Sequence, residues 1–145
     1  MKKINHCKIT IPAKSVNEGY ARAAVAAFAA LADPTLEELS DIRTAVSEAV
    51  TNCIVHAYRE TEGLIYIDLA LTAENEIRIR IRDKGCGIED IKRAREPLFT
   101  TAGEERSGLG FTVMESFSDK LSVRSAPGKG TTVTIVKRIK GKAAC

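Results

Sequence analysis

Two polar side chains, a carboxylate and an amide, lie one helical turn apart in the sequence. Glu48 and Asn52 are spaced i and i+4 in a segment of helical periodicity, and His56 continues the stripe one turn further on. An amide oxygen is a hard ligand suited to Mg²⁺, and a carboxylate one turn away could take a proton from a hydroxyl. Alone, such a stripe is more often the solvent side of a helix, although Lys–Glu pairs are its usual filling.

A second candidate comes directly after a strand-like segment, where Asp83 is followed by Gly85 and Gly87. The glycines let the backbone turn and let a ligand approach it closely. A carboxylate here could accept a hydrogen bond from the exocyclic amine of adenine, whereas guanine presents a carbonyl at that position. Such a site would prefer ATP to GTP. By itself the pattern is most often a simple turn.

Two further glycine patterns occur later in the chain. The segment 103–110 ends in Gly108-Leu109-Gly110 before a predicted helix, and N–H groups at a helix N-terminus bind anions. Its spacing is neither that of a P-loop nor that of the dinucleotide fingerprint. Residues 128–131, Gly-Lys-Gly-Thr, predict a hairpin turn with positive φ at the glycines.

The N-terminal half predicts one strand and two helices. A strand over residues 4–11 ends at Pro12, and Ser15 with Glu18 has the capping-box pattern of an Ala-rich helix. We expect this helix to bury Tyr20, Ala24, Phe28 and Leu31, because their helical spacing puts them on one face. Asp33 as N-cap and Pro34 as first residue would start a second helix that runs to about Tyr58.

The remaining elements predict the fold class. We expect strands over 64–72 and 76–83, a short helix over 89–95, a helix over 109–117, and strands over 121–125 and 131–139. Alternation of isoleucines and arginines in the second of these strands indicates a sheet with one packed face and one wet face. The order predicts a single α+β domain over 1–145, a two-layer sandwich in which helices cover one face of a mixed, mainly antiparallel sheet.

Composition excludes several classes of protein. The 145 residues are 44% hydrophobic and 28% charged, no apolar run is long enough for a membrane helix, and the N-terminus lacks signal-peptide features. A net charge of +3 is too small to indicate nucleic-acid binding. The four cysteines are scattered without zinc-site spacing, and we interpret Cys53 as a core residue. The expected compartment is the cytoplasm, without membrane or nucleic-acid partners.

The order of the four motifs resembles that of the GHKL ATPases, which include gyrase, histidine kinases and mismatch-repair ATPases. Glu-x₃-Asn, Asp-x-Gly-x-Gly, Gly-x-Gly and Gly-x-Gly-Thr are similar to the family's N box, G1, G2 and G3 motifs. The segments 47–52, 97–101 and 105–111 further resemble the small bacterial anti-sigma factor serine kinases, above all the sporulation type. This likeness extends to the N-terminal residues 20–22 and 26–28.

The resemblance implies a cytoplasmic homodimer that holds a sigma factor of the sigma-F type away from RNA polymerase. It also implies phosphorylation of a serine on an anti-anti-sigma partner with ATP and Mg²⁺. Glu48 would be the catalytic base, Asn52 the Mg²⁺ ligand, Asp83 the adenine acceptor and Arg22 a partner contact. Other implied nucleotide-binding residues are Gly85, Gly87, Thr100, Thr101, Arg106, Ser107, Gly108, Leu109, Gly110 and Thr131. The loop after Thr101 is short and lacks a basic residue next to the threonine pair.

Three alternatives stay open at this point. An anti-sigma binding module that holds ATP as a structural ligand would need Asn52 and Asp83 but not Glu48. The catalytic half of a histidine kinase is disfavoured, because 145 residues leave no room for a helical hairpin with a phospho-acceptor histidine. Among anti-sigma kinases, the general stress-response type is the near alternative to the sporulation type.

Overall fold

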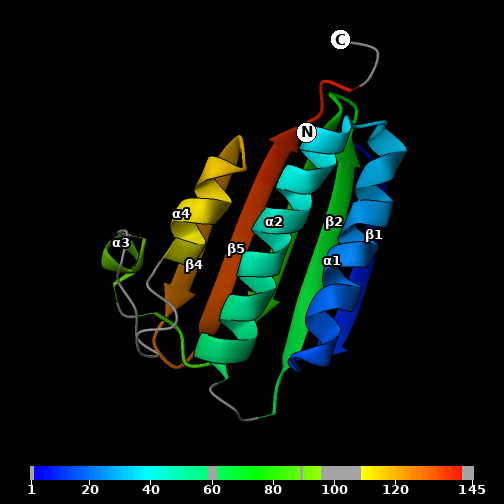
Figure 1. Cartoon of the computed structure of the whole chain (residues 1–145). Helices are drawn as coiled ribbons and strands as arrows, with labels where there is room; N and C mark the ends of the chain where they lie inside the picture. Colours follow the sequence, from blue (N-terminus) through cyan, green and yellow to red (C-terminus); the bar gives the residue numbers. More distant parts are fainter. Residues whose placement is uncertain (1, 59–61, 89, 96–108, 142–145) are drawn as a thin grey trace.

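Five strands form one sheet, and the helices lie across one of its faces (Figure 1). The structure is a computed structural model that describes residues 2–58, 62–88, 90–95 and 109–141. The elements are β1 Lys3–Pro12, α1 Val16–Ala29, η1 Ala30–Ala32, α2 Leu36–Asn52, η2 Cys53–Ala57, β2 Leu64–Thr72, β3 Glu76–Asp83, α3 Ile91–Ala94, α4 Leu109–Ser116, β4 Lys120–Ala126 and β5 Gly130–Arg138. The predicted order of elements and the two-layer α+β class are confirmed.

The sheet order is β1-β2-β3-β5-β4, and its four pairings are all antiparallel. The sheet is therefore antiparallel rather than mixed, because each neighbouring pair runs in opposite directions. The last strand in the sequence, β5, lies between β3 and β4, so the C-terminal part of the chain joins the edge strand β4 to the rest of the sheet.

Alternation along β3 separates the two faces of the sheet. Ile77, Ile79 and Ile81 are at most 1% exposed, whereas Arg80 and Arg82, each directly after an isoleucine, are exposed. The buried isoleucines join a core that also contains residues of α1, α2 and α4. Each fully buried side chain of this size contributes about 1.5–3 kcal/mol of hydrophobic free energy, which fixes the helices on this face.

The buried face of α1 differs from the predicted one. Ala21, Val25 and Phe28 are buried, whereas Tyr20 and Leu31 are 56% and 60% exposed. In an Ala-rich helix, two stripes rotated by one residue have similar periodicity, and small side chains allow the closer approach to the rest of the core. The prediction is confirmed at Phe28 and wrong at Tyr20 and Leu31, because it followed the largest side chains, while Ala24 is half-buried.

The start of α2 is set by Thr35, so the prediction of Asp33 as N-cap and Pro34 as first residue is wrong. The Thr35 Oγ1 accepts from the Glu38 N–H at 3.1 Å, and the Glu38 carboxylate accepts from the Thr35 N–H at 2.9 Å. Asp33 instead has a left-handed backbone, with φ of 55°. The predicted capping box at Ser15 is also absent, since that side chain makes no capping bond.

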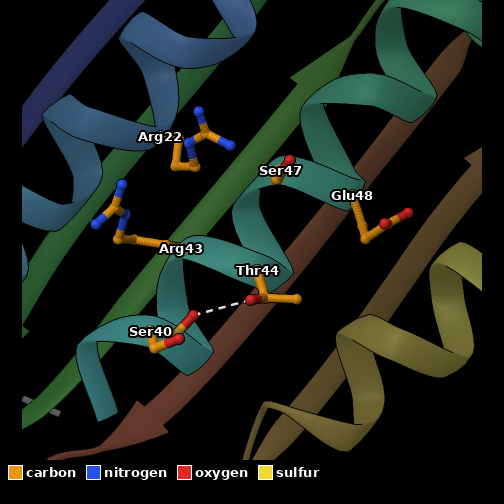
Figure 2. Close-up of a pocket in the computed structure, with 6 residues that line it drawn as sticks. All are labelled: Arg22, Ser40, Arg43, Thr44, Ser47 and Glu48. Carbon is orange, nitrogen blue, oxygen red and sulfur yellow. Dashed lines mark hydrogen bonds between the residues drawn. The ribbon is translucent and has the colours of Figure 1, made fainter. Parts of the chain in front are cut away.

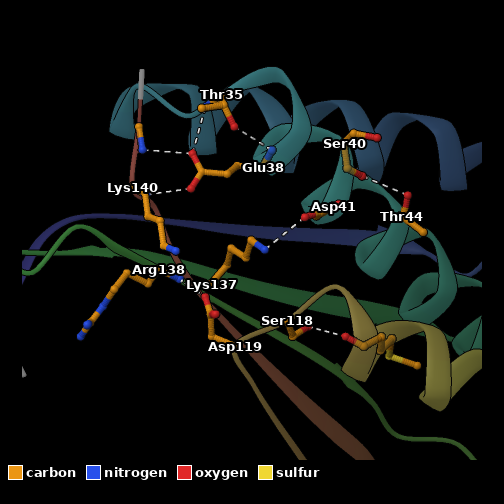
Figure 3. A network of polar contacts seen from close by, with 12 residues as sticks. Thr35, Glu38, Ser40, Asp41, Thr44, Ser118, Asp119, Lys137, Arg138 and Lys140 are labelled. Atoms are coloured by element: carbon orange, nitrogen blue, oxygen red, sulfur yellow. Dashed lines mark hydrogen bonds and ion pairs between the residues drawn. The ribbon is translucent and has the colours of Figure 1, made fainter. Parts of the chain in front are cut away.

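Glu38 also holds the chain after β5. Its carboxylate accepts from the backbone N–H of Lys140 at 2.7 Å and of Gly141 at 3.1 Å (Figure 3). Lys137 reaches the same helix, with its Nζ 3.2 Å from Asp41 Oδ2 (Figure 3). Burial alone would raise the pKa of Glu38, but the backbone N–H groups of Thr35, Lys140 and Gly141 hold this pKa below its ordinary value.

We predict that Glu38→Gln lowers the free energy of unfolding by about 1 kcal/mol near pH 7. The substitution should also make this free energy less dependent on pH in the acid range. Because the pKa of Glu38 is lower in the folded chain, its stabilisation is complete above the unfolded value near 4.5 and is lost as the pH falls further. Urea unfolding between pH 6 and pH 3 tests this, with Glu37→Gln, an exposed neighbour, as matched control. Parallel pH profiles for the wild type and Glu38→Gln would contradict the assignment.

Candidate nucleotide site

The Glu48–Asn52 stripe of α2 lies against the first turn of α4. A Cβ built on Gly110 would stand 3.3 Å from both Asn52 Oδ1 and Glu48 Oε2. The backbone of α4 therefore passes close to these two side chains, and a Cβ at position 110 would be in tight contact with both of them. The structure thus brings together two motifs that are far apart in the sequence.

Asn52 has an amide that the protein leaves available. The residue is partly exposed, and within the described part of the chain its side chain has no hydrogen-bond partner. Among those same residues, no three His, Cys, Asp or Glu side chains gather in a group that could hold a metal ion. A Mg²⁺ ion here would depend on Asn52 together with phosphate oxygens and water, which is how proteins commonly bind it.

Asp83 is a buried carboxylate at the end of β3, only 5% exposed. Its Oδ1 accepts from the N–H of Gly85 at 2.9 Å and of Thr131 at 3.2 Å. Its Oδ2 has the Cys53 thiol at 3.6 Å, which is a weak donor. One oxygen is therefore fixed by the backbone, and the other keeps capacity to accept from a ligand amine.

Burial raises the pKa of Asp83, and the bonds from Gly85, Cys53 and Thr131 act in the opposite direction. Burial, and then the charge of Asp83, raises the pKa of the Cys53 thiol well above 9.0. The thiol therefore stays protonated and donates. Cys53 is indeed a core residue, as predicted, but its contact with the carboxylate was not foreseen.

The glycines after Asp83 are required by backbone packing. A Cβ on Gly85 would stand 2.3 Å from the carbonyl oxygen of Ala57, and one on Gly87, where φ is 77°, would stand 2.1 Å from that of Ala126. Gly130 makes a similar approach to the backbone of Asp83, because a Cβ added to this glycine would stand 2.2 Å from the Asp83 carbonyl oxygen. These residues clamp the Asp83 loop between the π-helical turn η2 and the β4–β5 hairpin.

Two residues that the sequence analysis missed support the same loop. Ser125 Oγ accepts from the Ile88 N–H at 2.8 Å and lies 2.8 Å from Thr131 Oγ1. The Tyr58 hydroxyl accepts from the Lys84 N–H at 2.8 Å and donates to the Leu64 carbonyl at 2.6 Å. No local pattern marks either residue, because their partners come from other elements.

The other predicted site residues divide into two groups. Thr100, Thr101, Arg106, Ser107 and Gly108 lie outside the described residues, while Leu109 and Gly110 begin α4. Arg22 lies on α1, away from the Asp83 loop, where it pairs with Glu18 at 3.5 Å. It lines a groove of about 270 Å³ over α1 and α2, which Glu48 also lines (Figure 2).

The helices form one layer on an antiparallel sheet, α2 carries a polar stripe, and β3 ends in the buried Asp83. This combination is typical of the histidine kinase-like ATPase domains. The family model described as "Histidine kinase-like ATPase domain" matches residues 11–137, and the chain belongs to this family. It therefore carries an ATPase-type domain, in agreement with the GHKL resemblance of its motifs.

Several relatives are similar over nearly their whole length. The chain is 55% identical to "Anti-sigma F factor" of Caldanaerobacter subterraneus over 93% of this chain and 94% of the relative. It is 49% identical to "Anti-sigma F factor" of Bacillus subtilis over 97% of this chain and 98% of the relative.

Solved structures confirm the fold. The RsbU and RsbW domains of a Mycobacterium tuberculosis protein superpose with a TM-score of 0.68 at 21% identity, over 93% of this chain and 32% of that one. The mycobacterial sensor histidine kinase MprB superposes with a TM-score of 0.58 at 17% identity, over 93% and 99%. None of the helices in the described part of the chain is long and apolar enough to cross a membrane.

We predict that Asp83→Asn weakens ATP binding by about tenfold to a hundredfold and reduces the preference for ATP over GTP. The variant replaces an acceptor by an amide that also presents N–H donors to the base. Calorimetric titration with both nucleotides measures the effect, and Asp68→Asn, in the neighbouring strand on the opposite face of the sheet, is the control. Unchanged affinity in a folded Asp83→Asn variant would rule out the adenine contact.

Proposed function

We propose that the chain is an anti-sigma factor with serine protein kinase activity, which binds a sigma factor of the sigma-F type. In this proposal it uses ATP and Mg²⁺ to phosphorylate a serine of an anti-anti-sigma protein. The observation that carries the proposal is the close approach of α4 at Gly110, where a Cβ would stand 3.3 Å from both Glu48 and Asn52, the proposed base and the proposed Mg²⁺ ligand. The names and full-length coverage of the relatives support the anti-sigma role.

Each residue has a limited task, since phosphoryl transfer depends chiefly on positioning and charge neutralisation. ATP with Mg²⁺ supplies the phosphoryl group and part of the charge compensation. Asp83 accepts from the adenine amine through Oδ2, while its Oδ1 stays bonded to the backbone. Asn52 would offer its amide oxygen to the metal, and Glu48 would take the proton from the substrate serine, whose oxygen would bond to the γ-phosphoryl group as ADP leaves.

The N-terminus of α4 completes the proposed site. Its first N–H groups have no partner within the helix and favour an anion, and Gly110 brings them next to Asn52. Gly108, Ser107, Arg106, Thr101 and Thr100 would extend the phosphate contacts from the preceding segment. Gly85, Gly87 and Thr131 would act mainly by holding Asp83 in place.

The proposed partners meet the outer surface of α1 and α2. Arg22 is the proposed contact to the sigma factor, and we further propose that the chain works as a homodimer in the cytoplasm. An anti-sigma kinase of the general stress-response type is the near alternative, and the identity of the retained sigma factor decides between the two. A nucleotide-dependent binding module with little kinase activity is the other alternative.

We predict that Glu48→Gln lowers phosphate transfer to the anti-anti-sigma protein by about 10²–10⁴-fold, because the amide cannot accept the serine proton. ATP binding stays within about threefold of the wild type, since Asp83 and Asn52 are unchanged. Incubation with radiolabelled ATP and the anti-anti-sigma protein measures transfer. Equal transfer by both proteins would remove Glu48 from the mechanism, and no transfer by the wild type would favour the binding module.

We predict that Arg22→Ala weakens the sigma-factor complex by about tenfold while ATP affinity stays unchanged. The side chain lies on α1 beside the groove and does not belong to the Asp83 loop. Pull-down and calorimetric titration measure the complex, with Arg124→Ala of strand β4 as a control on another surface. A normal complex with Arg22→Ala would show that the sigma factor docks elsewhere.

A further inference from the structure

The outward face of α2 forms a continuous polar stripe that leads to the proposed phosphate site. Ser40, Arg43, Thr44, Ser47 and Glu48 follow one another at helical spacing, and all of them line the groove with Arg22 of α1 (Figure 2). Asn52 continues the stripe one turn beyond Glu48. A segment bound in this groove would therefore extend directly to the base and the Mg²⁺ ligand of the proposed site.

The two arginines of the groove differ in their charge environment. Glu18 lies 3.5 Å from Arg22 and also accepts a hydrogen bond from Ser47, so the charge of Arg22 is already compensated. Arg43 is exposed, and no carboxylate in the described part of the chain pairs with it. Arg43 is thus the groove's uncompensated cation.

Arg43 and Glu48 give the groove a direction. In Figure 2, Arg43 extends toward α1, and Glu48 extends from α2 toward α4. The hydroxyl of Thr44 between them donates to the Ser40 carbonyl at 3.0 Å, so this part of the stripe is already ordered. An acidic group would be favoured at the Arg43 end, whereas the carboxylate of Glu48 favours a hydroxyl donor.

The spacing predicts what a bound segment must look like. Arg43 and Glu48 are five residues apart on one helix, which gives an axial rise of about 7.5 Å and a rotation of about 140° between them. Their side chains diverge, as Figure 2 shows, so the distance between their charged ends exceeds the axial rise. An extended peptide advances about 3.3–3.6 Å per residue, so a segment that contacts both ends spans at least about three residues.

We propose that this groove receives the part of the protein substrate that flanks the phosphorylated serine, and that Arg43 selects a substrate carboxylate more than about 8 Å from the accepting hydroxyl. In an extended segment this carboxylate belongs to an aspartate or glutamate at least about three residues from the serine. Arg43 is therefore a specificity-determining residue. This inference rests on the proposed kinase function and adds the substrate feature that the site recognises.

A protein segment fits the groove better than a second nucleotide would. A polyphosphate would gain Arg43 but would also lie along Glu48 and beside Glu18, whose charges repel it. A peptide instead offers one carboxylate for Arg43, a hydroxyl for Glu48, and backbone groups for the serine and threonine hydroxyls of the stripe. The groove thus presents both signs of charge, and the peptide supplies a matching group for each.

The test compares the wild type with Arg43→Ala, Arg43→Lys and Arg43→Glu, using the anti-anti-sigma protein and labelled ATP. We expect Arg43→Ala to raise the KM for the protein substrate about tenfold, with kcat and ATP affinity unchanged. Arg43→Lys should keep the KM for the protein substrate close to the wild-type value. Arg43→Glu should raise this KM more than Arg43→Ala does. The difference in KM should shrink in 0.5 M NaCl.

Two controls make the test specific. Arg80→Ala removes an exposed arginine from the opposite face of the sheet and should leave KM within about twofold. Replacing the substrate's acidic residue near the serine by lysine should reproduce the loss with the wild-type kinase, and Arg43→Glu should restore phosphorylation of that substrate.

The outcomes separate this inference from the proposed function. An unchanged KM for Arg43→Ala overturns the role of Arg43, even if the wild type is an active kinase. If the wild type binds the anti-anti-sigma protein without phosphorylating it, the kinase proposal fails, and titration of the complex decides the inference. Weaker binding by Arg43→Ala then supports it, and equal binding overturns it. A wild type that neither binds nor phosphorylates the protein overturns both.

Discussion

The fixed position of the Asp83 carboxylate is the constraint on which the candidate site depends. A buried carboxylate is tolerated only when donors surround it, and here two backbone N–H groups and one thiol do so. One N–H comes from the loop after β3 and the other from β5, while the thiol comes from the end of α2. Strand, hairpin and helix are thereby joined at one carboxylate, and the same bonds leave one of its oxygens able to accept a further hydrogen bond.

The loop that carries Asp83 has little freedom to move. Its glycines approach the carbonyls of Ala57 and Ala126 so closely that no side chain fits, and Tyr58 and Ser125 bond to its backbone. On the other side of the site, α4 rests on Asn52 and Glu48 through Gly110. The proposed base contact thus lies in a tightly packed part of the fold, and the proposed phosphate contacts depend on how one helix terminus lies against another.

Sequence periodicity was sufficient for the strands and for the order of the elements, because alternation in β3 and helical spacing in α2 reflect burial directly. It failed where two local solutions had similar merit. Thr35 with Glu38 competed with Asp33 and Pro34 for the start of α2, and the bonds from Glu38 to the chain after β5 favour the former. Contacts such as Cys53 with Asp83 were not foreseen, since they join residues 30 positions apart.

The position of β5 also affects how the protein is made. Thr131 contributes to the pocket of Asp83 from 48 residues further along the chain, and β5 must insert between β3 and β4 to do so. Such long-range pairing is formed late and slowly, because the intervening chain must first be ordered. During synthesis on the ribosome, the surroundings of Asp83 are therefore incomplete until nearly the whole chain has emerged. A chain that is truncated or stalled before β5 would contain β1 to β4 but would lack Thr131, so the hydrogen bonds around Asp83 would be incomplete.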